Sequence, residues 1–111
     1  MVKDYTEEVK KLIKEYKKED IEYHKPIKYL CQRNSLTQDE IEESIMSCKE
    51  ISFTELQEKS YETRYALFFV YNKRRGNCFV LTFDEKITVV TIYPIGRKTI
   101  LRYKKKRFNK S

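Results

Sequence analysis

The apolar positions in the first part of the chain recur at helical spacing. Between residues 4 and 19 they fall every three or four positions among Lys and Glu, which predicts an amphipathic helix. A second, short helix is expected to begin near Pro26, whose fixed φ suits a first turn, and to end around Asn34. The third predicted helix has the clearest start, because Thr37 and Glu40 have the spacing of a capping box. The apolar face of this third helix carries Ile41, Ile45 and Cys48.

From Tyr61 onward the pattern becomes that of strands. The polar segment 72–77, with one Gly, separates two β-prone runs and predicts a hairpin. Turns are expected at 84–86 and 94–96, and the polar segment 104–111 is expected to fray as a basic tail. The predicted strands cover residues 51–56, 61–71, 78–83, 87–93 and 99–103.

This order of elements predicts the fold class. Helix formers crowd residues 4–50, and aromatic and β-branched residues crowd residues 51–103. Helices followed by strands indicate an α+β fold, in which N-terminal helices pack on one face of an antiparallel sheet of four to five strands. A length of 111 residues fits a single domain.

Composition excludes several classes of protein. With 40% apolar and 14% aromatic residues the chain is too hydrophobic to be disordered. No apolar run approaches a membrane span and the N-terminus is polar, so we expect a cytoplasmic protein without membrane contact. The three cysteines fit neither a disulfide framework nor a zinc site, and no phosphate-binding loop, HExxH or CxxC motif occurs. We therefore expect no metal and no cofactor.

The charge is divided between the two halves of the chain. The whole sequence has a net charge of +7, whereas residues 61–111 carry 13 basic and only 3 acidic side chains, a net charge of +10. Such a field attracts polyanions, which makes nucleic acid the default partner, although charged turns can also serve solubility alone. The expected phosphate contacts are Lys73, Arg74 and Arg75 at a hairpin tip, Arg97 and Lys98 in a turn, and Arg102, Lys104, Lys105, Lys106 and Arg107 at the end.

Two kinds of side chain add candidate chemistry. His24 is the only histidine, and histidine is the one side-chain type whose unperturbed pKa lies near neutral pH. On sequence alone, a lone histidine is more often a structural polar residue beside a helix or in the core than a catalyst. Tyrosines among the basic clusters are candidates for stacking on unpaired bases, or for cross-strand aromatic pairs: Tyr65, Tyr71, Tyr93 and Tyr103.

One stretch resembles a known family. The positions that carry the likeness are Tyr23, His24, Lys25, Pro26, Leu30, Gln32, Arg33, Leu36, Thr37, Asp39, Glu40, Ile41 and Ile45. They resemble the opening of a small domain family related to the RelE toxins, which pairs a His with an Arg near the end of one short helix. The run 87–93 is similar to that family's characteristic strand before its last turn.

The resemblance implies a fold shared with RelE and, more distantly, with the barnase and colicin D ribonucleases. The sheet would then be curved and its open face would hold RNA. Such toxins cleave RNA without a metal, by attack of the substrate's own 2′-hydroxyl on the neighbouring phosphorus. His24 and Arg33 are carried over by position, as acid or base and as phosphate ligand. From their places on or beside the sheet we add Arg64 and Arg97 as cations and Tyr93 as proton donor or stacking ring.

Three hypotheses follow from these features. The first is a RelE-like toxin, an mRNA interferase-like endoribonuclease paired with an antitoxin protein. The second is a noncatalytic nucleic-acid-binding module that uses the same basic face. The third is a protein-interaction module whose partner wraps an acidic segment around the basic sheet. The sequence leaves open the RNA target, the antitoxin and the oligomeric state.

Overall fold

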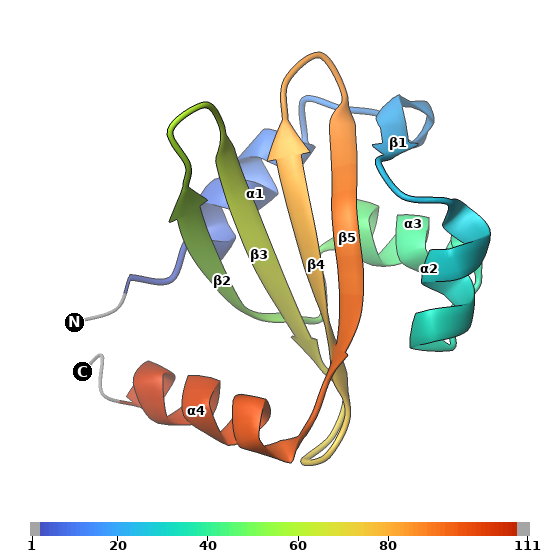
Figure 1. Ribbon diagram of the computed structural model, residues 1–111. Coiled ribbons are helices and arrows are strands. Elements are labelled where there is room, and N and C mark those ends of the chain that lie inside the picture. The colour runs from blue at the N-terminus through green and yellow to red at the C-terminus, as the bar shows by residue number, and fades with distance from the viewer. Residues whose placement is uncertain (1–2, 109–111) are drawn as a thin grey trace.

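Within residues 3–108, five strands form one mixed sheet, and three helices cover one of its faces (Figure 1). The computed structural model describes the backbone of these residues and the side chains of residues 3–102. The helices are α1 (Thr6–Ile13), α2 (Ile27–Asn34), α3 (Gln38–Ser47) and α4 (Arg97–Phe108), with a 3₁₀ turn, η1 (Lys18–Asp20). The strands are β1 (Ile21–Tyr23), β2 (Ile51–Glu58), β3 (Thr63–Val70), β4 (Gly76–Phe83) and β5 (Ile87–Ile95). The expected α+β fold is confirmed.

The strand order is β1-β5-β4-β3-β2, and all pairs are antiparallel except β1 with β5. The expected hairpin and the turn at 84–86 are therefore present. The purely antiparallel sheet that we expected is wrong at one edge, because the three-residue β1 pairs in parallel with the start of β5, Ile21 opposite Ile87. A strand of three residues is too short to show an alternating pattern in the sequence, and its pairing with β5 stabilises it.

The N-terminus of α3 is defined by hydrogen bonds between residues close in the sequence. The Thr37 hydroxyl accepts the backbone N–H of Glu40 at 3.1 Å, and the Glu40 carboxylate accepts the N–H of Thr37 at 2.9 Å. The predicted capping box is confirmed. The first helix is shorter than the expected 4–19, because after Ile13 the chain turns toward the β4–β5 turn, where the Tyr16 hydroxyl donates to the Asp84 carbonyl at 2.5 Å.

Both faces of the sheet are buried, by different elements. The first face packs under α1, α2 and α3, with Leu67, Phe69, Phe79 and Leu81 against Val9, Leu30 and Ile41. The second face packs in part under α4, with Phe53, Phe68, Cys78 and Ile95 around Ile100. Double-sided burial explains why the central strands read as continuous apolar runs.

A bulge in β5 sets which side chains reach each face. Val80 pairs with Thr91 but Leu81 pairs with Val89, so Val90 is an extra residue. The bulge shifts the alternation, and Val89 and Ile92, three positions apart, both join the first-face cluster.

The end of the chain differs from the sequence prediction. Residues 99–103, expected as a last strand, are helical within α4, and residues 104–108 of the expected fraying tail continue that helix, whereas 109–111 lie outside the described residues. The turn expected at 94–96 is also wrong in part, since Pro94 and Ile95 belong to β5. Seven of the twelve residues of α4 are Lys or Arg, good helix formers, and Ile100, 1% exposed, anchors the helix on the second face. No helix among the described residues is long and apolar enough to cross a membrane.

Candidate functional site

The turn between β3 and β4 presents three cations to solvent. The side-chain oxygen of Asn72 accepts the backbone N–H groups of Arg74 at 2.8 Å and Arg75 at 2.9 Å. The N–H of Tyr71 donates to the Arg75 carbonyl at 3.0 Å and closes the turn. Because the turn uses backbone groups and one amide, the exposed side chains of residues 73–75 are left for other contacts.

Sheet register places the start of α4 beside this turn. Gly76 pairs with Val70 on one side and with Ile95 on the other, so the turn at 73–75 and the α4 N-terminus lie at the same end of the sheet, as Figure 1 shows. We call this surface the basic end. It consists of the exposed residues Lys73, Arg74, Arg75, Arg97, Lys98 and Arg102.

The cations of the basic end are not paired with acids. Among the described residues, none of its six side chains makes an ion pair with an acid. Residues 104–107 continue α4 beyond Arg102 and add four more basic residues. The structure therefore brings together two of the three predicted basic clusters and joins the third to them through α4.

His24 lies shortly before α2, and Arg33 lies in the last turn of that helix. His24 follows β1, its backbone N–H donates to the Val89 carbonyl at 2.9 Å, and its side chain is exposed. Arg33 is also exposed, and it donates to the hydroxyl of Tyr29 at 3.2 Å, with its guanidinium 6.0 Å from the ring centroid. Arg33 thus contacts its own helix, and no hydrogen bond within the described residues joins it to His24.

Arg64 and Tyr93 lie on the second face of the sheet. Arg64 is half-buried and forms an ion pair with Glu62. Tyr93 pairs with Cys78 of β4, and Arg64 is next to Tyr65, which pairs with Leu81 of β4. The positions of Tyr93 and Arg64 are therefore about 10–13 Å apart along the strand direction. The structure places both residues on the same face but in separate rows, and Arg33 belongs to a helix on the other side.

Cys78 beside Tyr93 is not set up as a nucleophile. Burial raises the pKa of the Cys78 thiol to about 12, although a side-chain hydrogen bond with Tyr93 acts in the opposite direction. At neutral pH the thiol is therefore protonated, and the thiolate required for attack is scarce.

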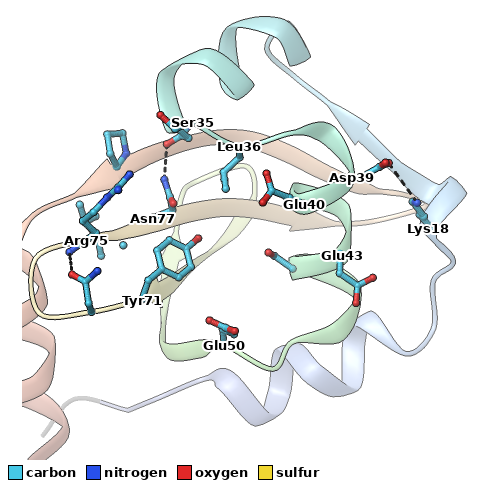
Figure 2. Close-up of a pocket in the computed structure, with 16 residues that line it drawn as sticks. Lys18, Ser35, Leu36, Asp39, Glu40, Glu43, Glu50, Tyr71, Arg75 and Asn77 are labelled. Atoms are coloured by element: carbon cyan, nitrogen blue, oxygen red, sulfur yellow. Dashed lines mark hydrogen bonds and ion pairs between the residues drawn. The ribbon is translucent and has the colours of Figure 1, made fainter.

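A groove on the helix side was not predicted from the sequence. It has a volume of about 970 Å³ and lies between α3, the α2–α3 connection and the β3–β4 hairpin (Figure 2). We call it the acidic groove, because four carboxylates line it and two cations, Lys18 and Arg75, stand among its lining residues. The four carboxylates are those of Asp39, Glu40, Glu43 and Glu50.

Two buried asparagines form one wall of the acidic groove. Asn34 donates both side-chain protons, to the Leu30 carbonyl at 2.8 Å and the Ile92 carbonyl at 3.0 Å. Its oxygen must then be the acceptor for the Asn77 amide nitrogen, 2.8 Å away. This sequence of donors fixes the orientation of Asn77 and directs its own oxygen away from Asn34.

Tyr71 stands across the groove from α3. Burial raises the pKa of its hydroxyl, and the negative charges of Glu50 and Glu40 raise it further. In Figure 2 the ring lies between the Asn77 side chain and Glu50. The ring therefore lies near the amide of Asn77 and the negative charge of Glu50.

Local sequence signals account for only part of these sites. The three carboxylates of α3 fall on neighbouring turns and are visible in the sequence, but Asn34 and Asn77 are 43 positions apart, so only the fold brings them together. Among the described residues, no group of three or more His, Cys, Asp or Glu side chains is placed to hold a metal ion. No protein-family model, no curated protein and no solved structure matches the chain.

Proposed function

We propose that the protein binds RNA and that the basic end contacts the phosphates. The observation that carries this proposal is the convergence of two separate basic segments, residues 73–75 and 97–98, on one end of the sheet. A surface that served only solubility would need no such convergence, and it would mix both signs of charge.

The geometry favours binding along the phosphate backbone. Exposed Arg and Lys side chains on a turn and along a helix can follow a flexible chain of phosphates, and phosphate contacts supply most nonspecific nucleic-acid affinity. Single-stranded RNA suits this surface because a hairpin tip and a helix form an uneven, basic end rather than one flat platform. Sequence reading is not required for this mode of binding.

The test is the salt dependence of binding to a short RNA of mixed sequence. If several phosphates are neutralised, log affinity should fall linearly with log salt, by about 0.7 per phosphate contact on a single strand. The double variant Arg74→Glu/Arg75→Glu should weaken binding about tenfold or more at moderate salt. Its matched control is Lys11→Glu/Lys14→Glu, the same change of charge at exposed positions of α1 and its C-cap.

Equal losses in the two double variants would mean that RNA responds to net charge alone, and the basic end would not be its site. A flat salt dependence would remove the nucleic-acid proposal. In that case tight binding of a glutamate-rich peptide would favour the interaction module that the sequence left open.

Cleavage of the bound RNA is a second candidate function, in line with the resemblance to RelE-related domains. The observation that favours it is the exposed side chain of His24, the only imidazole of the chain, which a substrate can reach. In this proposal His24 accepts the proton of a 2′-hydroxyl whose oxygen attacks the neighbouring phosphorus. The bond between phosphorus and the 5′-oxygen breaks, and the leaving 5′-oxygen takes up a proton from water, with no step assigned to a metal.

RNA incubated with the protein in excess chelator should then yield fragments, and His24→Ala should slow their release by about 10²-fold or more. Lys25→Ala, at the next position, is the control and should cleave as the parent does. Cleavage that persists in His24→Ala would exclude this histidine as the catalyst. Intact RNA with undiminished binding would leave a noncatalytic binding module.

A further inference from the structure

The acidic groove presents hydrogen-bond acceptors and negative charge from several elements at once. Glu43 comes from α3 and Glu50 from the connection to β2. Among the described residues neither carboxylate forms an ion pair, whereas Asp39 has Lys18 at 3.9 Å and Glu40 is engaged in the capping box. Two carboxylates of the groove are thus free to balance the charge of a ligand.

A second observation, independent of the carboxylates, points to a ligand with N–H groups. Asn77 is only 4% exposed, and its side-chain oxygen accepts no hydrogen bond from any described residue. Because Asn34 uses both of its own protons on backbone carbonyls, the Asn77 oxygen cannot exchange places with the nitrogen. It turns into the groove on the side of Tyr71 (Figure 2). The Asn77 nitrogen is held by Asn34, so the oxygen faces the groove in a fixed direction and is open to a hydrogen-bond donor of a ligand.

We propose that the acidic groove binds an organic cation of the aliphatic polyamine class. One ammonium group donates to the Asn77 oxygen near the ring of Tyr71, where cation–π attraction adds to the hydrogen bond. The other ammonium groups are directed toward the separate carboxylates of Glu50 and Glu43, which line the same groove. Leu36 and Pro94 line the groove as well and offer apolar contacts to the alkyl chain that joins the ammonium groups.

Other ligand classes fit the groove less well. Phosphates and carboxylates would be repelled by four acidic side chains, and a divalent metal would need at least three ligands gathered at one point. A volume of about 970 Å³ lies within the range of small-molecule sites. The whole protein carries a net charge of +7, so saturable binding of a cation would have to come from this local field. The inference does not require RNA binding at the basic end, with which the groove shares Arg75.

The experiment is a calorimetric titration of spermidine into the intact protein at physiological ionic strength. We expect saturable binding with one site, and we expect Glu43→Gln/Glu50→Gln to weaken it about tenfold or more. The matched control is Glu7→Gln/Glu15→Gln, which removes the same charge from exposed positions of α1 and the segment that follows it. Both double variants replace exposed residues, and their melting temperatures check that they are folded.

Nuclear magnetic resonance of the same titration locates the ligand. Spermidine should shift the side-chain amide of Asn77 and the ring signals of Tyr71, and Mg²⁺ at equal ionic strength should not. Equal weakening in the two double variants, or equal shifts with Mg²⁺, would overturn the proposal, because either result means ordinary counterion attraction. Binding of a lysine-rich peptide without binding of spermidine would also overturn it, in favour of a protein ligand.

Discussion

Asn77 of β4 donates its side-chain amide to the oxygen of Asn34 at the end of α2, 2.8 Å away, with both residues buried. Asn34 in turn donates to the carbonyl of Ile92 on β5 and to that of Leu30 on its own helix. One pair of amides therefore ties the helix layer to two adjacent strands. The bond to Ile92 also shows why β5 tolerates a proline. The carbonyl of Ile92 points to the outer edge of β5, away from β4. The nitrogen of Pro94, two residues further on, points to the same edge, so its missing N–H removes no hydrogen bond to β4.

Replacing Asn34 by alanine should destabilise the protein strongly. The change removes three hydrogen bonds and leaves the buried amide of Asn77 without its acceptor, a loss of about 2–4 kcal/mol in the free energy of unfolding. Asn72→Ala, in the exposed β3–β4 turn, removes two hydrogen bonds where water can replace them and should lose about 1 kcal/mol or less. Urea unfolding measures both. Similar losses would mean that the Asn34 network contributes no more than a surface turn.

The two glycines of the chain should differ strongly in their tolerance of alanine. A Cβ at Gly76 would meet the backbone oxygen of Phe69 closer than real Cβ contacts allow, and the side chain of Ile95 at 3.0 Å. The oxygen belongs to a paired central strand and cannot retreat, so Gly76→Ala should lose about 3 kcal/mol.

At Gly96 no described atom lies within 4 Å of an added Cβ, and its φ is not positive. Alanine there loses the mild preference for glycine at a helix N-cap and gains from a stiffer unfolded chain, so the net change should stay within about 1 kcal/mol. Thermal and urea unfolding of the two variants test the contrast. An undisturbed Gly76→Ala protein would show that β3 and β4 can separate at that point.

The sequence predicted those elements that are stabilised by interactions between residues close to one another in the chain. The capping box of Thr37 marked the start of α3, and the polar turn with alternating runs marked the β3–β4 hairpin. The last predicted strand failed for a physical reason. The β-branched Thr99 and Ile100 resemble a strand locally, but the segment packs on the second face of the sheet as a helix, which buries Ile100 among side chains far away in the sequence.

For the candidate sites, too, the sequence shows the residue clusters but not the long-range contacts that bring them together. The basic residues were visible as clusters, but their convergence depends on the pairing of Gly76 with Ile95. The acidic groove depends on a contact between Asn34 at the end of α2 and Asn77 on β4, and no spacing in the sequence indicates that contact.

Removing the N-cap hydroxyl of α3 should have a moderate effect. Thr37→Ala leaves the N–H of Glu40 without its partner at an exposed helix end, and we expect a loss of about 1 kcal/mol. Thr37→Ser keeps an oxygen at that position and should retain most of the stability. Denaturant unfolding of the two variants gives the comparison, and an alanine variant as stable as the parent would mean that water replaces the cap fully.

Tyr23 should make stability fall at alkaline pH. Its hydroxyl donates to the carboxylate of Glu42 at 2.7 Å, and burial, followed by this hydrogen bond and the negative charge, raises its pKa well above the usual value for tyrosine. An unfolded chain releases this proton near pH 10, whereas the folded protein holds it to higher pH. The unfolded state therefore binds fewer protons above about pH 10, and folding stability decreases as the pH rises from there, by up to about 1.4 kcal/mol per pH unit for one such group. Below about pH 9 the contribution is fully present.

The variant Tyr23→Phe separates this effect from the rest of the alkaline limb. At neutral pH it should lose about 1–2 kcal/mol, because the hydrogen bond to Glu42 is gone. Its stability should then fall less steeply than that of the parent above pH 10, while a smaller slope remains from Tyr16, Tyr65 and Tyr71, whose pKa values burial also raises. Tyr61→Phe, at a ring that is 78% exposed, is the control and should follow the parent at every pH. Urea unfolding at a series of pH values tests both variants. If the parent and Tyr23→Phe lose stability in parallel up to about pH 11, ionisation of Tyr23 is not the cause of alkaline unfolding.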